Sequence, residues 1–290
     1  MKLPTKPSTR YSELQHARVL IYSRSNGFGK TKLCSQIPNA LFLCTEDGAN
    51  FLDVASVRLN SWQDFRAVVA ELEKPGHGFE TVVIDTIDRL VRLKEDDWCK
   101  QNAPNTPKSN YHEGCDIIER QFDRGLDHLG RLPNLGIWLI GNSVDASKGD
   151  EPTHYDLKMP RNHAKCRNTV RDFADIILFG EVRPNGSRVL YANQRGPFHA
   201  KDRTDRLPDA IELPDKNKNF EAIRNAFYEH TKHDHSDRKA TAPTKGKRGN
   251  ARQRQNVAPG KVHGRDSGAE DEQSRGPVQR AGVLDVQSVG

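Results

Sequence analysis

The residues best suited to chemistry in this sequence are the consecutive Gly29, Lys30 and Thr31, which follow an aliphatic run and a loop of small residues. A loop of this kind between a strand and a helix turns backbone amides toward anionic oxygens. We expect Lys30 to reach the β- and γ-phosphates of ATP, and the Thr31 hydroxyl to bind Mg²⁺. The residues predicted to contact the nucleotide are Ser25, Asn26, Gly27, Phe28, Gly29, Lys30, Thr31 and Lys32.

The opening of this loop departs from the standard phosphate-loop pattern, G-x-x-x-x-G-K-[ST]. Arg24 stands where the pattern has its first glycine, five residues before Gly29. Two explanations remain open at this point. The loop is one residue longer and opens at Ser23, or its first turn is distorted and the affinity for nucleotide is reduced.

Two carboxylates are predicted to complete the site. Asp85 ends the aliphatic run Thr81–Asp85, the Walker B form, and can hold the magnesium shell through water. Glu46 ends a second such run, so it is the candidate group that orients or deprotonates the attacking water. Taken alone, Asp85 could be a helix cap and Glu46 a solvated loop residue. Asn142, after the run Gly136–Gly141, is the candidate sensor of the γ-phosphate.

Alternating strands and helices are predicted to position these residues. Short β-branched and aliphatic runs bounded by turn formers read as buried strands. They alternate with helical patterns, which predicts an α/β fold with a mainly parallel sheet and helices on both faces. The expected strands are 18–22, 40–45, 81–85, 136–141 and 175–179, with an edge strand at 188–193. A short helix is expected to start at Thr31, and further helices are expected at 62–73, 87–101, 113–129 and 161–173.

Composition limits folding to the first part of the 290-residue chain. Residues 231–290 hold 12 Lys and Arg against 7 Asp and Glu, so they carry +5 of the net charge of +6. With so little apolar surface they are predicted to form a disordered basic tail, which either touches nucleic acid or only solubilises the chain. The predicted divisions are an extension at 1–16, a folded domain at 17–230 and the tail.

Five cysteines with no metal-ligand spacing fit a reducing cytoplasm better than a disulfide framework. No apolar run approaches the ~20 residues of a membrane span, so no membrane partner is expected.

With these residues in place, the chain resembles the RecA-like branch of P-loop ATPases, and more narrowly the phage-encoded AAA-type ATP-binding proteins that include Sak-type single-strand annealing proteins. The similarity covers about residues 17–214. It implies a RecA-like P-loop NTPase core with strand order 5-1-4-3-2, and ATP and Mg²⁺ as cofactors. The segments that carry it are Leu20–Leu33, Pro38–Glu46, Ser61–Phe65, Thr81–Asp88 and Ala200–Pro208.

The resemblance also implies partners. Relatives complete their sites across a subunit interface with basic residues near the last strand, so Arg195, Lys201 and Arg203 are candidate trans fingers; a solvated basic face is the alternative. The loop after the sensor strand contacts single-stranded DNA in RecA-like proteins, although a long polar loop can also be a plain insertion. The candidate DNA-binding residues here are Lys148, Lys158, Arg161 and Lys165.

The leading hypothesis is therefore a phage or prophage recombination ATPase, acting in the host cytoplasm, whose ATP state controls its grip on single-stranded DNA. A filament or ring of identical subunits and a single-strand-binding protein are the expected further partners. The alternative is a non-hydrolysing nucleotide-binding switch or scaffold with a distorted loop. A small-molecule kinase would need an acceptor pocket and an Arg-rich lid, and the sequence identifies neither.

Overall fold

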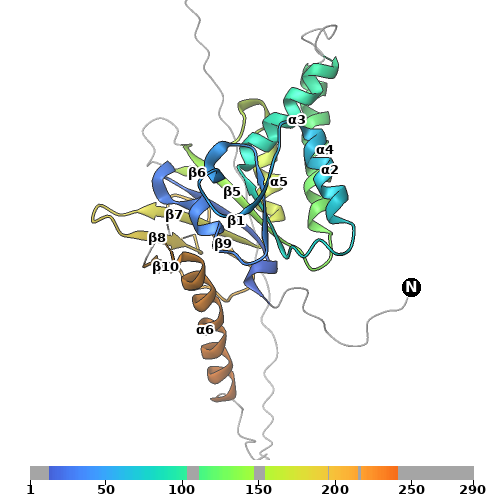
Figure 1. Cartoon of the computed structure of the whole chain (residues 1–290). Helices are drawn as coiled ribbons and strands as arrows, with labels where there is room; N and C mark the ends of the chain where they lie inside the picture. The colour runs from blue at the N-terminus through green and yellow to red at the C-terminus, as the bar shows by residue number, and fades with distance from the viewer. Residues whose placement is uncertain (1–12, 103–110, 147–153, 195, 215–216, 241–290) are drawn as a thin grey trace, which may run out of the picture. The chain divides into compact units, whose positions relative to one another are not determined.

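The aliphatic runs form one sheet, in which the strand order is β10-β8-β7-β1-β5-β4-β2-β3 (Figure 1). This computed structural model describes residues 13–102, 111–146, 154–194, 196–214 and 217–240. The strands are β1 (Arg18–Ser23), β2 (Ala40–Cys44), β3 (Ala55–Arg58), β4 (Thr81–Asp85), β5 (Gly136–Asp145), β6 (Tyr155–Leu157), β7 (Ile176–Val182), β8 (Arg188–Tyr191), β9 (Lys201–Asp202) and β10 (Ala210–Leu213).

The centre of the sheet is parallel and has the predicted order. β7, β1, β5, β4 and β2 lie side by side, which confirms the order 5-1-4-3-2 expected of a RecA-like core. In this order β5 lies between the strand that leads into the phosphate loop and the strand that ends at Asp85. Ser23 of β1 is in register with Asn142 of β5, and Asp85 with Ile140. The polar residues at these strand ends therefore meet at one edge.

Short strands extend the sheet beyond this centre, and the sequence did not predict most of them. β3 adds to β2 in parallel, β6 pairs with the end of β5, and β9 pairs with the start of β7, the last two being antiparallel. The prediction that 188–193 is an edge strand is wrong, because β8 is covered on its outer side by β10.

Helices cover both faces of the sheet. The helices are α1 (Lys30–Cys34), α2 (Trp62–Leu72), α3 (Ile87–Asn102), α4 (Tyr111–Gly130), α5 (Lys165–Phe173) and α6 (Asn219–Ala240). Alternate residues of the central strands point to opposite faces, so the core has two clusters. One packs against α2, α3, α4 and α5, the first three of which lie together in Figure 1, and the other packs against α1 and α6.

Local signals explain where some helices begin. The Ser61 hydroxyl accepts a hydrogen bond from the Asp64 amide, and the Asp64 carboxylate accepts one from the Ser61 amide, so the predicted capping box at the start of α2 is present. The helix predicted over 161–173 is split: a 3-10 turn, η6 (Arg161–His163), precedes α5.

The folded part extends further than predicted at both ends. Leu14, in the 3-10 turn η1 (Leu14–His16), is buried in the core, although residues 1–16 were expected to be an extension. The boundary expected at residue 231 falls inside α6, which continues to Ala240. Most of the predicted tail, residues 241–290, lies outside the described part of the chain.

Candidate nucleotide-binding site

The predicted phosphate loop runs from the end of β1 to the start of α1. Its middle is a 3-10 turn, η2 (Asn26–Phe28), which Ser25 caps, because the Gly27 N–H donates to the Ser25 hydroxyl at 3.2 Å. Gly29 follows with φ of 92°, in the left-handed region that favours glycine, and α1 begins at the next residue. Gly29 is therefore required by the backbone turn that aims α1 at the site.

Arg24 fits at the loop opening without backbone strain. Among the described residues other than glycine, only Asn39, Asn134 and Asp205 have a positive φ, so no glycine is needed at position 24. The guanidinium of Arg24 lies 5.0 Å from the ring centre of Tyr155 on β6, and 3.7 Å from a carboxylate oxygen of Glu181 on β7. These contacts draw the side chain toward β6 and β7.

Lys30 is a buried cation at the start of α1. Only 5% of the residue is exposed, and its Nζ donates to the Ser23 hydroxyl at 3.0 Å. Burial lowers the pKa of the Lys30 ammonium, and the nearby carboxylates Asp85, Asp88 and Glu46 oppose that change. These carboxylates therefore act on the ammonium from nearby, and Lys30 lines a cavity that an anionic ligand can enter.

Thr31 and Asp85 are in direct contact. The Thr31 hydroxyl donates to Asp85 Oδ2 at 2.7 Å. Burial raises the pKa of Asp85, and the hydrogen bond from Thr31 opposes this change. A hydroxyl and a carboxylate this close offer Mg²⁺ the oxygen ligands it prefers, with further positions left to water and phosphate. The donor set therefore fits the magnesium site predicted from the sequence.

Two residues hold Glu46: Thr86, which precedes α3, and Arg89 in the first turn of α3. The Thr86 hydroxyl donates to Glu46 Oε1 at 3.4 Å, and Arg89 Nε lies 3.3 Å from the same oxygen. The Glu46 side chain remains 40% exposed. The preceding Thr45 hydroxyl accepts from the Thr86 amide at 2.8 Å, which fixes the end of β2 against the end of β4. Glu46 is thus oriented but still open to water.

A cavity of about 690 Å³ brings the predicted catalytic and metal-binding residues together. Its size is within the usual range of small-molecule sites. Asn142, the expected γ-phosphate sensor, lies on its wall. The residues predicted to bind nucleotide or metal, or to act in catalysis, that line the cavity are Gly29, Lys30, Thr31, Lys32, Glu46, Asp85 and Asn142.

The residues of this site fall within a segment of the chain that matches a known family. The model of the AAA domain family matches residues 15–204, a span that includes the phosphate loop, Glu46, Asp85 and Asn142. The chain belongs to the AAA domain family. No curated protein matches it. Among solved structures, the RadB recombinase is similar, with 15% identity, a TM-score of 0.40, and 70% of this chain and 90% of that chain covered.

Part of the predicted phosphate loop does not line the cavity of this AAA domain. The Phe28 side chain is buried and packs against Gly180, where an added Cβ would lie 2.8 Å from the ring, so only its backbone can serve a nucleotide. The side chain of Asn26 lies outside what the structure describes.

The basic residues proposed as trans fingers lie away from the cavity of their own AAA domain. Lys201 and Arg203 donate to the backbone carbonyls of Arg171 and Asp172 at the end of α5, a favourable place for cations. β9, which carries Lys201, pairs with the first residues of β7, at the sheet edge opposite the phosphate loop. Arg195 lies outside the described residues.

The four candidate DNA-binding residues have different surroundings. Lys148 lies outside the described residues, and Lys165 forms ion pairs with Asp116 and Glu119. Arg161 is exposed on η6. Lys158, just after β6, lines the cavity of about 690 Å³. The structure therefore places only Lys158 among the residues predicted to bind nucleotide and metal.

Three supporting residues were not predicted. Ser23 holds Lys30, while Thr86 and Arg89 hold Glu46. Arg89 carried a signal in the sequence, because it falls in the first turn of the helix predicted to start at Ile87, directly after the strand that ends at Asp85.

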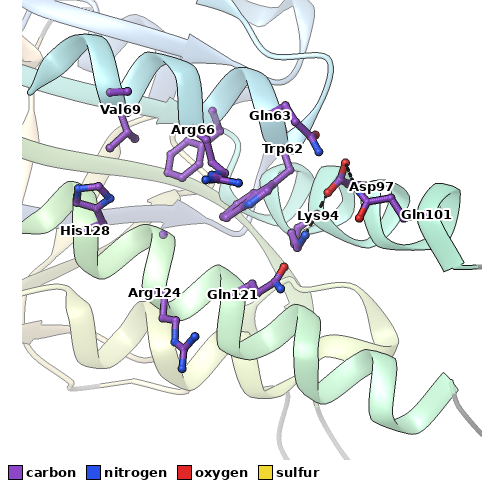
Figure 2. Close-up of a pocket in the computed structure, with 13 residues that line it drawn as sticks. Trp62, Gln63, Arg66, Val69, Lys94, Asp97, Gln101, Gln121, Arg124 and His128 are labelled. Carbon is purple, nitrogen blue, oxygen red and sulfur yellow. Dashed lines mark hydrogen bonds and ion pairs between the residues drawn. The ribbon is translucent and has the colours of Figure 1, made fainter.

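A second hollow, of about 570 Å³, lies between α2, α3 and α4 (Figure 2). Its floor includes Trp62, and Figure 2 shows the nearby ion pair of Lys94 and Asp97, whose side chains are 5% and 11% exposed. None of the predicted site residues lines it.

Among the described residues, no helix is both long and apolar enough to cross a membrane.

Proposed function

We propose that this AAA domain binds Mg-ATP and hydrolyses it. The observation that carries the proposal is the contact between Thr31 and Asp85, because it brings the predicted magnesium ligands within 2.7 Å of each other beside the buried Lys30. When bound, Mg²⁺ would neutralise phosphate charge during the reaction. The residues that would hold it are Thr31, directly, and Asp85, through water.

Glu46 would act as the general base. Its carboxylate is fixed by Thr86 and Arg89, is partly exposed, and belongs to the same cavity as Lys30. It would orient a water and accept its proton while Lys30 binds the phosphate oxygens. The Asn142 amide would donate a hydrogen bond to the γ-phosphate from the end of β5, between the two nucleotide-binding strands.

We further propose that ATP controls binding to single-stranded DNA in recombination or strand annealing, as in the phage-encoded proteins that the sequence resembles. The Arg24–Tyr155 contact supports a link, because it joins the phosphate loop to the β5–β6 hairpin beside the exposed Arg161. Lys165 is a weaker DNA ligand in this scheme, since its ammonium is already paired with two carboxylates. The proposal also keeps a filament or ring of identical subunits, with Arg195, Lys201 and Arg203 as the candidate trans fingers.

Phosphate release, titrated with single-stranded DNA, tests the proposal. Wild type should turn over ATP, and DNA should change the rate. Lys30→Ala should lose nucleotide binding, whereas Glu46→Gln should bind ATP and release phosphate about 10²- to 10⁴-fold more slowly. Glu71→Gln, an exposed carboxylate of α2, is the matched control.

The same assay separates hydrolysis from the alternative function. Tight Mg-ATP binding without phosphate release, with or without DNA, would replace the ATPase by a nucleotide-binding switch. Salt-independent DNA binding, or none, would remove the DNA part, because contacts with phosphates weaken as salt rises.

A further inference from the structure

Lys158 has a position that its sequence context did not indicate. Its backbone amide donates to the Asn142 carbonyl at 2.8 Å, so it lies beside the candidate sensor residue. Asn142 is in register with Ser23 at the end of β1. Lys158 therefore sits over β5, between the strands that deliver Lys30 and Asp85.

The backbone that carries Lys158 is firmly held. Arg167 of α5 donates to the Leu157 carbonyl at 2.7 Å, and both Arg167 and Arg171 form ion pairs with Asp156. Leu157 packs over Gly141 so closely that an added Cβ there would lie 2.3 Å from it. The backbone that carries the Lys158 ammonium is thus held in place before ligand binds, and preorganisation is the condition for effective stabilisation of developing charge.

The charges of the cavity leave a role for such a cation. Lys30, which is buried, and Lys32 are the cations that line the cavity from α1, and Arg89 is paired with Glu46. Lys158 is exposed, lines the same cavity, and forms no ion pair in the described part of the chain. Lys201 and Arg203, the expected sources of a mobile cation, donate to backbone carbonyls at the far edge.

We propose that Lys158 is a catalytic residue that supplies, within the same subunit, the positive charge that stabilises the transferred γ-phosphoryl group. The proposal rests on the ATPase function. It assigns to Lys158 a contact with phosphate oxygens at the β5 side of the cavity, opposite Lys30, and removes it from the candidate DNA-binding residues. Charge on those oxygens is what a positioned cation stabilises in phosphoryl transfer.

The first test compares Lys158→Ala with wild type. Single-turnover phosphate release should fall about 100-fold or more, as for loss of one transition-state donor, while the dissociation constant for Mg-ATP changes little. Lys158→Arg keeps the charge and should recover part of the rate. Lys74→Ala, an exposed lysine of the α2 end, should behave as wild type.

A mixing experiment tests whether the lysine acts within its own subunit. Lys30→Ala subunits keep Lys158 but do not bind ATP, and Lys158→Ala subunits bind ATP but lack the cation. If the lysine acts within its subunit, the mixture shows only the two separate rates. Recovery of turnover on mixing would show that Lys158 works across an interface and would overturn the proposal.

Other results distinguish this proposal from the ATPase function. A wild type that releases no phosphate overturns both. An active wild type with an equally active Lys158→Ala overturns the role of Lys158 alone, as does a Lys158→Ala variant that loses Mg-ATP binding in step with turnover. Unchanged turnover with weakened single-stranded DNA binding would return Lys158 to DNA recognition.

Discussion

Thr31 and Asp85 are 54 positions apart in the chain, and the hydroxyl of one donates to the carboxylate of the other at 2.7 Å. The contact exists because β4 ends at the edge of the sheet where β1 leads into α1, with β5 between them. A parallel sheet thus brings two distant sequence motifs into contact, as the proposed pair of oxygen ligands for Mg²⁺.

Replacing Thr31 by Ala should weaken the response to magnesium. The variant keeps Asp85 and Lys30 but loses one oxygen ligand, so the Mg²⁺ concentration for half-maximal turnover should rise on the order of 10-fold or more. Thr31→Ser keeps the hydroxyl and serves as the control. Magnesium titrations of phosphate release at saturating ATP measure the effect. An unchanged magnesium requirement in Thr31→Ala would place the metal elsewhere.

The sequence was a good guide to the centre of the sheet and to the residues at its edge. Long aliphatic runs such as Thr81–Asp85 and Gly136–Gly141 form buried strands, because a sheet that is covered on both faces removes their apolar side chains from water. Parallel strands then bring their carboxyl ends together, so Lys30, Asp85, Glu46 and Asn142 were predictable from position alone.

The remaining features depend on tertiary contacts that no local pattern records. β3 and β10 are four residues each, and such strands are defined by the neighbour they pair with. Lys158 reaches the cavity only because β6 turns back onto β5 and its amide meets Asn142. The resemblance to RecA-like proteins predicted DNA binding for this segment instead.

Replacing Arg24 by Gly should leave nucleotide binding nearly unchanged. The Arg24 backbone does not need glycine, and its side chain contacts Tyr155 and Glu181. We expect the Mg-ATP dissociation constant to change by less than about threefold, since exposed charge contacts contribute under about 1 kcal/mol. Calorimetry measures it, with Lys30→Ala as the non-binding reference. Tightening of 10-fold or more (about 1.4 kcal/mol) would show that Arg24 distorts the loop.

Replacing Gly125 by Ala should destabilise the protein, although alanine favours helices by about 1 kcal/mol. A Cβ at Gly125 in α4 would lie 2.7 Å from the indole of Trp62, which is 4% exposed in the floor of the hollow in Figure 2. Overpacking of this kind costs about 1–3 kcal/mol.

Urea unfolding of four proteins isolates this contact. They are wild type, Gly125→Ala, Trp62→Leu and the double variant. In the Trp62→Leu background the added methyl meets a smaller side chain, so its cost should largely disappear. A Gly125→Ala variant that is more stable than wild type would mean that Trp62 moves aside freely.

The capping box of α2 should make stability depend on acid pH. The amides of Asn60 and Ser61 donate to the Asp64 carboxylate at 2.7 and 3.0 Å, and they lower its pKa from the ordinary 3.8. Because the folded pKa lies below the unfolded one, the stabilisation is complete above the unfolded value and is lost as pH falls through the folded value.

Asp64→Asn should therefore lower the free energy of unfolding near neutral pH, by no more than about 1 kcal/mol for so exposed a group. Urea unfolding at about pH 7 and about pH 3 should show the gap between the two proteins closing in acid. A gap that stays constant, or widens, would mean that the ionised carboxylate does not cap the helix.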